Sequence, residues 1–422
     1  MNATRAPETI VPTALVSFPT LSLSERDRRY AALRSLMKVH DVQALVVFPG
    51  GLDRLERYLS NEVLNGVVVL THTDGAVYLV GRHPLQRYDA VGVTFPRWVD
   101  DLRLGSPAEL LPKLIAERVD SAPRIGVVGL SSRSIGMGDG YIPYPLWHAI
   151  VGAMPSASFF DMSAAVEMLS LVKSREELEM VRASAILGEA ASSAFVEAAH
   201  AGVRESSVVG AAYAAIVSGG GEIHTPGIIE RSGPDRFGWA PPEWLTMGGG
   251  SRILEPGDTI SAELFAHYGG YQTQQQIDVS IGKPIQLIRD LEDACVESYK
   301  IGISMLRPGV LFSEVASAME KPILESGFWN TGPQIQTVCP VMFNSATHQN
   351  THVDSALSVL PAMPPTVPRD GDFELVEGVA FAVQPNALLH GRRVSLGGTV
   401  ALTEHGVEEM NGLALRLNVV EA

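Results

Sequence analysis

The chain has 422 residues, 46% of them hydrophobic, so it can bury one large core or two ordinary ones and is not a disordered protein. Its formal net charge of −15 argues against nucleic-acid binding, which requires clusters of Lys and Arg that this sequence does not assemble. The two cysteines, Cys295 and Cys339, match neither a metal-site spacing nor a disulfide framework. With no leading signal segment and no apolar run of membrane length, we expect a cytoplasmic protein that does not enter a membrane.

The first part of the chain alternates strands and helices. Residues 1–21 are expected to form an N-terminal arm, and the capping box from Ser22 to Glu25 predicts a helix to about residue 40. Further elements are expected as strands at 44–48, 67–70, 76–80 and 125–129, with a hairpin turn at Asp74-Gly75 and a helix at 109–119. Such alternation predicts a small α/β domain over residues 22–168.

A second capping box, from Ser174 to Glu177, predicts a long helix to about residue 200 and opens a second domain over residues 169–422. The expected elements beyond it are a helix at 204–218, an irregular segment at 218–250, a hairpin at 258–283, helices at 287–305 and 312–326, and strands from 378 onward. His267 and Tyr268 are expected to be exposed at the hairpin tip.

The hairpin carries the most informative motif. Gly257-Asp258 opens it, Glu263 lies in its first strand, and Gly270-Tyr271 precedes Gln274 in the second. This order resembles the active-site hairpin of creatinases, prolidases and aminopeptidases P, the pita-bread family. In that family two aspartates, at the positions of Glu263 and Gln274, bridge a pair of divalent metal ions.

The resemblance continues towards the C-terminus. A family glutamate falls on Gln384, in Val383-Gln384-Pro385, and the last one falls on Gly397. The resemblance therefore implies an α+β protein, with a C-terminal pita-bread domain and a smaller N-terminal creatinase-like α/β domain. It also implies a homodimer.

Metal binding is not expected, because neutral amides do not replace the carboxylates and imidazoles that hold divalent ions. We therefore predict no cofactor. His348 and His352 are four residues apart and could share one helix face as a two-histidine site. Their polar neighbours favour a loop instead, where the two histidines are hydrogen-bonded, exposed or in contact with substrate.

The amides suggest a polar pocket. Alternate residues of a strand face one side, so Gln274 and Gln276 should point together, with Gln384 nearby and Gln275 facing away. Because an amide both donates and accepts, this arrangement suits a neutral polar or amide-bearing ligand. The alternative is a solvated strand face.

Two residues are candidates for proton transfer. Glu263 has apolar neighbours, so burial could raise its pKa and make it a general acid or base; alternatively it is paired with Arg252 or Arg393. His224 is the candidate histidine, and its alternative is an ordinary loop residue. Asp278 is a possible second carboxylate, with a turn or cap at the strand end as the favoured role.

Other candidates would contact the substrate. Arg231 and Arg236 could clamp a substrate carboxylate, and Trp239 and Trp244 could wall a pocket or simply pack. Tyr271 joins this set through the family motif.

The sequence thus predicts a metal-independent, creatinase-like enzyme. Its expected reaction is hydrolysis of a non-peptide C–N bond in a small polar substrate by general acid/base catalysis. Three alternatives stay open: a non-catalytic binding or scaffold protein, a metal-free lyase or rearrangement enzyme, and a metal-dependent Xaa-Pro peptidase with an unfamiliar ligand set.

Overall fold

The computed structural model describes residues 15, 17–50, 54–62, 65–81, 97–119, 122–131, 140–224, 227–233, 240–348 and 372–422. Most of the expected N-terminal arm lies outside these residues. No helix within the described ranges combines the length and apolar character needed to cross a bilayer.

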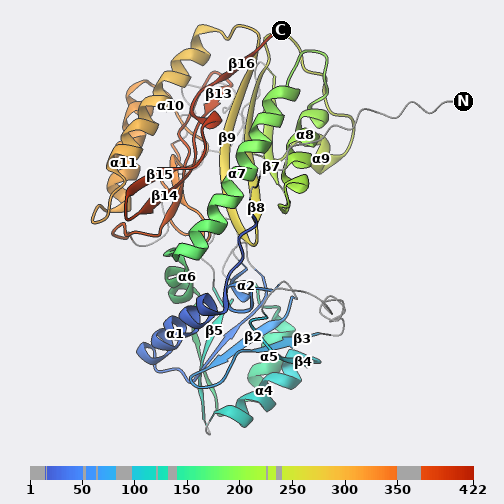
Figure 1. The fold of residues 1–422 in the computed structure, drawn as a ribbon, viewed down its shortest axis with the longest axis vertical. Helices are drawn as coiled ribbons and strands as arrows, with labels where there is room; N and C mark the ends of the chain where they lie inside the picture. Colours follow the sequence, from blue (N-terminus) through green and yellow to red (C-terminus); the bar gives the residue numbers. More distant parts are fainter. Residues whose placement is uncertain are drawn as a thin grey trace, which may run out of the picture.

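The N-terminal part is built on one mixed sheet with the strand order β4-β3-β2-β1-β5-β6 (Figure 1). Its strands are β1 (Ala44–Val47), β2 (Val67–Thr71), β3 (Val77–Val80), β4 (Asp101–Leu104), β5 (Arg124–Val128) and β6 (Ser158–Asp161). Its helices are α1 (Leu23–Val39), α2 (Leu55–Ser60), α4 (Pro107–Arg118), α5 (Tyr144–Ala153) and α6 (Ser163–Leu171).

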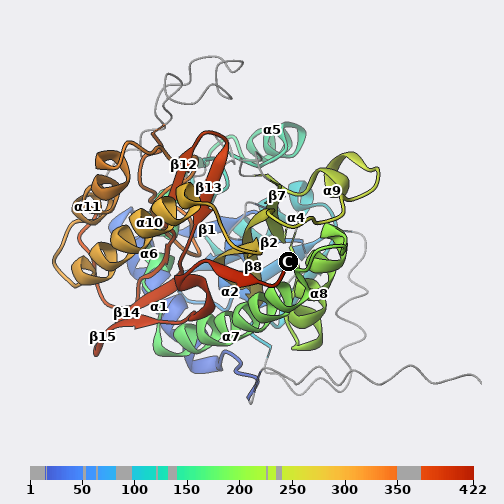
Figure 2. The same ribbon diagram turned by 90° about the horizontal axis from the view of Figure 1, so that it is seen from above.

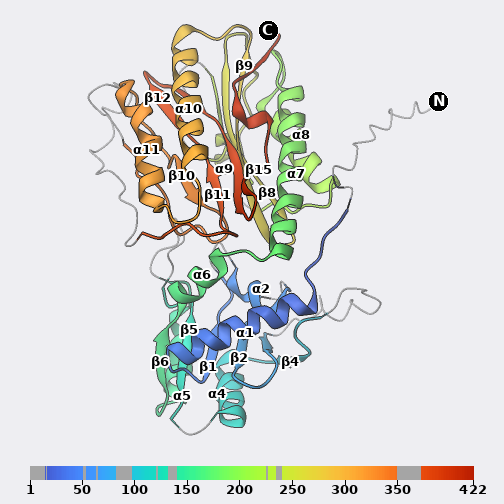
Figure 3. The ribbon, with the colours of Figure 1, turned by 60° about the vertical axis from the view of Figure 1, so that its left-hand side comes forward.

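Both faces of this sheet are buried. Leu45 and Val47 of β1 pack in a core with α1 and α6, while Ala44 and Val46 pack in a separate core with α4 and α5. This division follows from the alternation of side chains along a strand. Figure 3 shows α1 lying along one side of the sheet.

The C-terminal part is centred on a long hairpin. Strands β8 (Thr259–Tyr268) and β9 (Tyr271–Ile281) pair along their whole length, and the sheet order is β16-β9-β8-β7. The two flanking strands are β7 (Ile228–Ser232) and β16 (Asn418–Val420), so β9 is not an edge strand.

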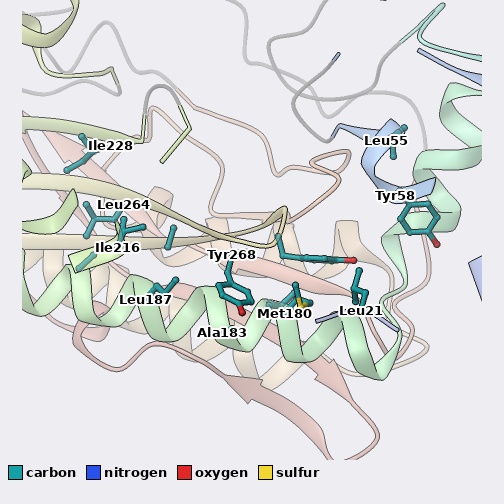
Figure 4. Close-up of a cluster of buried hydrophobic side chains, with 14 of the residues drawn as sticks. Leu21, Leu55, Tyr58, Met180, Ala183, Leu187, Ile216, Ile228, Leu264 and Tyr268 are labelled. Carbon is teal, nitrogen blue, oxygen red and sulfur yellow. The ribbon is translucent and has the colours of Figure 1, made fainter. Parts of the chain in front are cut away.

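Helices α7 (Arg175–Ala198) and α8 (Glu205–Ser218) cover one face of the hairpin through a continuous apolar core (Figure 4). Leu187 and Ile216 from these helices, for example, share this core with Leu264 of β8. On the opposite side lie α10 (Gln286–Met305) and α11 (Phe312–Glu325), with the hairpin between the two helix pairs (Figure 2).

Short strands complete this second side. They are β10 (Ile335–Thr337), β11 (Ala380–Val383), β14 (Gly398–Thr403) and β15 (Gly406–Glu409) in one sheet, and β12 (Asn386–Leu389) and β13 (Arg392–Ser395) as a pair. Two short helices, α9 (Glu243–Met247) and η2 (Leu413–Leu415), complete the described elements.

Most predicted elements are confirmed. The capping box at the start of α7 forms in both directions: the Ser174 hydroxyl accepts from the Glu177 amide, and the Glu177 carboxylate accepts from the Ser174 amide. At α1 only one half forms, because the Ser22 amide donates instead to Glu176. The expected domain boundary at residues 168 and 169 falls inside α6.

Two expectations are wrong. The segment 218–250 was expected to be irregular, yet it contributes β7, which pairs with β8. His267 and Tyr268 were expected to be exposed, but each is only 8% exposed, because the hairpin tip is covered by other parts of the chain.

A buried charged network joins the two parts. The Arg29 guanidinium on α1 is 2% exposed and contacts four groups: Glu25 Oε1 at 2.8 Å, Glu177 Oε1 at 3.1 Å, the Tyr271 hydroxyl at 2.6 Å and the Tyr58 carbonyl at 2.9 Å. The Tyr271 hydroxyl in turn donates to Glu177 Oε1 at 2.9 Å. One arginine from the first part therefore meets groups from α7 and from the start of β9.

Candidate active site

The hairpin face away from α7 and α8 is polar. Glu263, Gln276 and Asp278 lie on this face together with Gln274, because the β8–β9 register pairs Glu263 with Gln276 and residues opposite each other share a side. All four side chains are at most 3% exposed. The predicted common orientation of Gln274 and Gln276 is confirmed, and a solvated strand face is excluded for them.

Gln275 faces the other way, as predicted. It packs on α7, where a Cβ built on Gly188 would lie 2.3 Å from the Gln275 carboxamide. A helix glycine therefore makes room for the one glutamine that points away from the polar face.

The amides of the polar face bind one another in pairs. Gln276 Nε2 donates to Gln384 Oε1 at 3.2 Å, and Gln336 Nε2 donates to Gln274 Oε1 at 2.8 Å. Ser395 Oγ adds a donor to Gln276 Oε1 at 3.0 Å. These bonds link the hairpin to β10, β13 and the end of β11.

Gln336 was missed by the sequence analysis. The available signal was the alternation Gln334-Ile335-Gln336 in a short strand, which places both amides on one side. The Gln334 side chain is also buried, and it exchanges hydrogen bonds with the backbone of Asn386.

A buried cation accompanies the carboxylates. Arg393 on β13 is 4% exposed, and its charge interacts with both Asp278 and Glu263. Of the two partners considered for Glu263, the structure therefore supports Arg393, because Arg252 binds Asp258 instead, with Nη1 and Oδ2 2.5 Å apart.

Asp278 is not a turn or cap residue. It lies within β9, fully buried, and its Oδ2 accepts a hydrogen bond from the Ser395 amide at 2.8 Å. Burial raises the pKa of this carboxyl to about 7, although the Arg393 charge opposes the shift. Both protonation states are therefore accessible near neutral pH.

His224 lies in a different cluster. Its Nε2 is 3.0 Å from Glu222 Oε2, and its ring stacks on His267 with the centroids 4.1 Å apart. The hydrogen bond with His224 lowers the pKa of Glu222 to about 2, and burial, with a smaller contribution from His224, lowers the pKa of His267 to about 3. His267 is four residues from Glu263 on β8, or about 13 Å along the strand, so His224 and Glu263 are not brought together.

A family model adds an independent observation. The model for metallopeptidase family M24 matches residues 179–407, which is more than half of the chain. The chain belongs to metallopeptidase family M24.

Individual relatives agree with this M24 assignment. The uncharacterized hydrolase/peptidase y4tL of Sinorhizobium fredii is 27% identical over 47% of this chain and 50% of the relative, so the match spans half of that protein. The probable dipeptidase PepE of Mycobacterium tuberculosis is 24% identical over 75% of this chain and 83% of the relative.

The fold is that of a solved Xaa-Pro dipeptidase. The structure of the Xaa-Pro dipeptidase from Bacillus anthracis superimposes with a TM-score of 0.70 at 18% identity, covering 94% of this chain and 100% of that one. The pita-bread fold expected from the hairpin motif is thus confirmed.

The donor set on the polar face does not fit the metal pair of the M24 family. At the positions that the resemblance assigns to metal ligands, this chain has Glu263, Gln274, Gln384 and Gly397, and both glutamines are hydrogen-bonded to other amides. In the described ranges, no three His, Cys, Asp or Glu side chains form a group that could hold a metal ion. Neutral amides and the carboxyl groups of Glu263 and Asp278, offset by the Arg393 guanidinium, give too little negative charge for two divalent ions.

The remaining candidates are dispersed over this M24 fold. Arg231 and Trp244 line a common cavity of about 90 Å³ beside β7, but Arg231 Nη1 already donates to the Pro241 carbonyl at 2.6 Å. Tyr271 lies in the network with Arg29, away from the polar face. Arg236, Trp239 and His352 lie outside the described residues.

His348 is not on a helix, so a helical two-histidine site is wrong for this residue. Its Nε2 lies 3.1 Å from Glu320 Oε2 on α11, and its amide donates to Asn330 Oδ1 at 2.6 Å. These contacts agree with the hydrogen-bonded loop position that the polar neighbours favoured.

Proposed function

We propose that this chain is a metal-independent member of family M24 that hydrolyses a non-peptide C–N bond in a small polar substrate. The observation that carries the proposal is the composition of the polar face, where paired amides and an arginine surround two carboxyl groups. The relatives described above are an uncharacterized hydrolase/peptidase and a probable dipeptidase, which supports the hydrolase class.

Asp278 is the proposed acid/base group. With a pKa of about 7 it can take a proton from an attacking water and return it to the departing nitrogen at neutral pH. The positive charge of Arg393 offsets the negative charge of the neighbouring Glu263 carboxylate in this buried environment. The paired amides offer donors and acceptors that would orient a neutral polar substrate.

In this proposal the carboxyl groups of Asp278 and Glu263, rather than His224, serve proton transfer. His224 is already hydrogen-bonded to Glu222, and its ring stacks on His267 near the hairpin tip. The homodimer implied by the family resemblance remains part of the proposal and can be measured by light scattering.

The test combines metal content with turnover. Elemental mass spectrometry of the purified protein should find no stoichiometric transition metal, and a panel of small amides, ureas and guanidino compounds should reveal a hydrolysis that resists chelators. Asp278→Asn should abolish that hydrolysis, while the surface variant Asp290→Asn should retain it. Two tightly bound metal ions per chain would overturn the metal-independent assignment.

A non-catalytic binding protein is the second candidate. The observation that favours it is that Gln274, Gln276, Gln336 and Gln384 already satisfy one another in the buried face. Such a protein would be stabilised by one class of small ligand in a thermal-shift screen without converting it. Turnover of the stabilising ligand, tracked by mass spectrometry, separates the two candidates.

A further inference from the structure

A cavity of about 50 Å³ lies at the junction of the two parts, and none of the paired amides lines it. Residues from α1, α2, the α6–α7 connection and the hairpin tip line it. Its charged lining is unusual for a chain of net charge −15: the basic residues are Arg29, Arg54, Arg57 and Lys173, against the single carboxylate of Glu177.

The four cations differ in the groups that bind them and offset their charge. Arg29 is held by Glu25 and Glu177, as described above. Lys173 Nζ donates to the backbone carbonyls of Ser170 and Leu171 at 2.7 and 3.2 Å, and also to the carbonyl of Cys339. Arg54 Nε lies 3.3 Å from Glu56 Oε1. Burial raises the pKa of the Glu56 carboxyl, so this group ionises less readily and offsets the Arg54 charge less well.

Arg57 is the least satisfied of the four. Its Nη1 is 3.3 Å from Glu222 Oε1, and Glu222 is shared with His224. Its Nε is buried and, within the described residues, has no hydrogen-bond acceptor. A buried donor in this state costs free energy that an acceptor would recover.

The hairpin tip packs directly against this guanidinium. Gly270 has φ +90°, and a Cβ built on it would lie 2.7 Å from Arg57 Nε. Glycine is therefore required both by the turn and by the close approach of the arginine.

We propose that this cavity is a binding site for a small oxyanion, with Arg57 as its principal donor. A volume of about 50 Å³ exceeds the space for one water and suits a group such as phosphate or a compact carboxylate. Guanidinium groups bind both through paired N–H donors. The bound anion would connect α2 to the hairpin tip and would not contact the polar face, so the inference does not depend on the proposed reaction.

The test measures anion-dependent stability of the full chain at constant ionic strength. Inorganic phosphate and malonate are titrated separately, with sodium chloride as the matched salt, and the midpoint of thermal unfolding is recorded. We expect a saturable rise in the midpoint with at least one oxyanion and none with chloride. Phosphate acting alone identifies a phosphate site, and malonate acting alone identifies a carboxylate site.

Variants locate the effect. Arg57→Gln keeps the approximate size of the side chain and should weaken the apparent affinity about tenfold or more, since it removes a charge-assisted hydrogen bond. Arg182→Gln, which removes a surface arginine bound to Glu408, should leave the affinity unchanged. Arg54→Gln serves as a second variant if Arg57→Gln does not fold.

Either of two results would overturn the proposal. One is an equal response to chloride and to both oxyanions, which would show general screening. The other is an unchanged oxyanion affinity in a folded Arg57→Gln or Arg54→Gln protein.

Discussion

Asp278 and His267 lie on one face of the hairpin, and burial displaces their pKa values in opposite directions. Each is favoured in its uncharged form, because a buried ion loses hydration. An uncharged Asp carries a proton and an uncharged His does not, so their contributions to the pH dependence of stability have opposite signs.

Asp278 should lower stability as the pH rises. Its folded pKa of about 7 lies above the ordinary value of 3.8, so between these values the folded state binds more protons than the unfolded state. The contribution is at most about 1.4 kcal/mol per pH unit. In urea unfolding at pH 5 and pH 8, wild type should lose more stability than Asp278→Asn over this interval; equal losses would contradict the assigned pKa.

His267 should lower stability as the pH falls. Its folded pKa of about 3 lies below the ordinary value of 6.5, so the contribution to stability is complete above pH 6.5 and is lost progressively towards pH 3. His267→Phe keeps a ring against His224 but cannot titrate. Its unfolding free energy should therefore decline less than that of wild type between pH 6.5 and 4.5, measured by urea titration.

The exposed residue His405, whose side chain is 87% exposed, supplies the matched control as His405→Phe. This substitution should leave the decline in unfolding free energy between pH 6.5 and 4.5 unchanged. Glu222 adds its own loss below pH 4.5 in every variant, because its pKa is lowered to about 2. If the unfolding free energies of His267→Phe and wild type declined in parallel as the pH falls, a group other than His267 would be responsible for the loss of stability in acid.

At the residue scale, strand alternation was enough to predict that Gln274 and Gln276 point together. It could not predict their partners, since Gln336 and Arg393 reach the face from distant strands. Nor could it place His224, which stacks on a residue that was expected to be exposed. These contacts depend on tertiary packing between segments that are far apart in the sequence; Gln274 and Gln336, for example, are 62 residues apart.

At the scale of elements, helix α7 fits closely against the hairpin at Gly188. Gly188→Ala should destabilise the protein by about 1–3 kcal/mol, because the new methyl group would meet the Gln275 carboxamide. This loss should exceed the gain of up to about 1 kcal/mol that Ala brings to a helix interior.

Gly210 in α8 provides the comparison, since nothing lies within 4 Å of a Cβ built there. Gly210→Ala should leave stability unchanged or raise it by up to about 1 kcal/mol. Chemical denaturation of both variants measures the contrast. If the two substitutions had the same effect, helix propensity alone would explain them, and the close contact at Gly188 would have no energetic role.

Elements with strong local signals were predictable. The capping residues Ser22 and Ser174 marked helix starts, and Asp74-Gly75 marked the turn between β2 and β3. Strand β7 was missed because Gly, Pro and Trp dominate its surroundings, and only the pairing with β8 orders it. The local sequence of β7 does not indicate that this segment will pair with β8.

At the scale of the whole molecule, Arg29 should stabilise the junction far more than its neighbour Arg28. Removal of Arg29 leaves Glu25 and Glu177 buried without their central cation, which should cost about 3–5 kcal/mol in Arg29→Met. Arg28 contacts the same two carboxylates, but its side chain is 43% exposed, so Arg28→Met should cost about 1 kcal/mol or less.

Urea unfolding followed by tryptophan fluorescence measures both junction variants. We expect the Arg29→Met transition to begin at clearly lower urea than that of Arg28→Met, and to broaden or split if the two parts unfold separately. Similar midpoints for the two variants would show that the buried position of Arg29 contributes nothing extra.

The paired amides also constrain how this chain could change in evolution. A glutamine codon becomes a glutamate codon through one base change, so carboxylates are always a short mutational step away at Gln276 and Gln384. Gln276→Glu would replace the donor of the Gln276–Gln384 bond and set a buried anion against the Gln384 acceptor. Gln384→Glu would keep that acceptor but lose the donor that Gln384 Nε2 gives to the Pro333 carbonyl. Each single step therefore costs a buried hydrogen bond, and the amide pair opposes a stepwise change to a carboxylate-lined site.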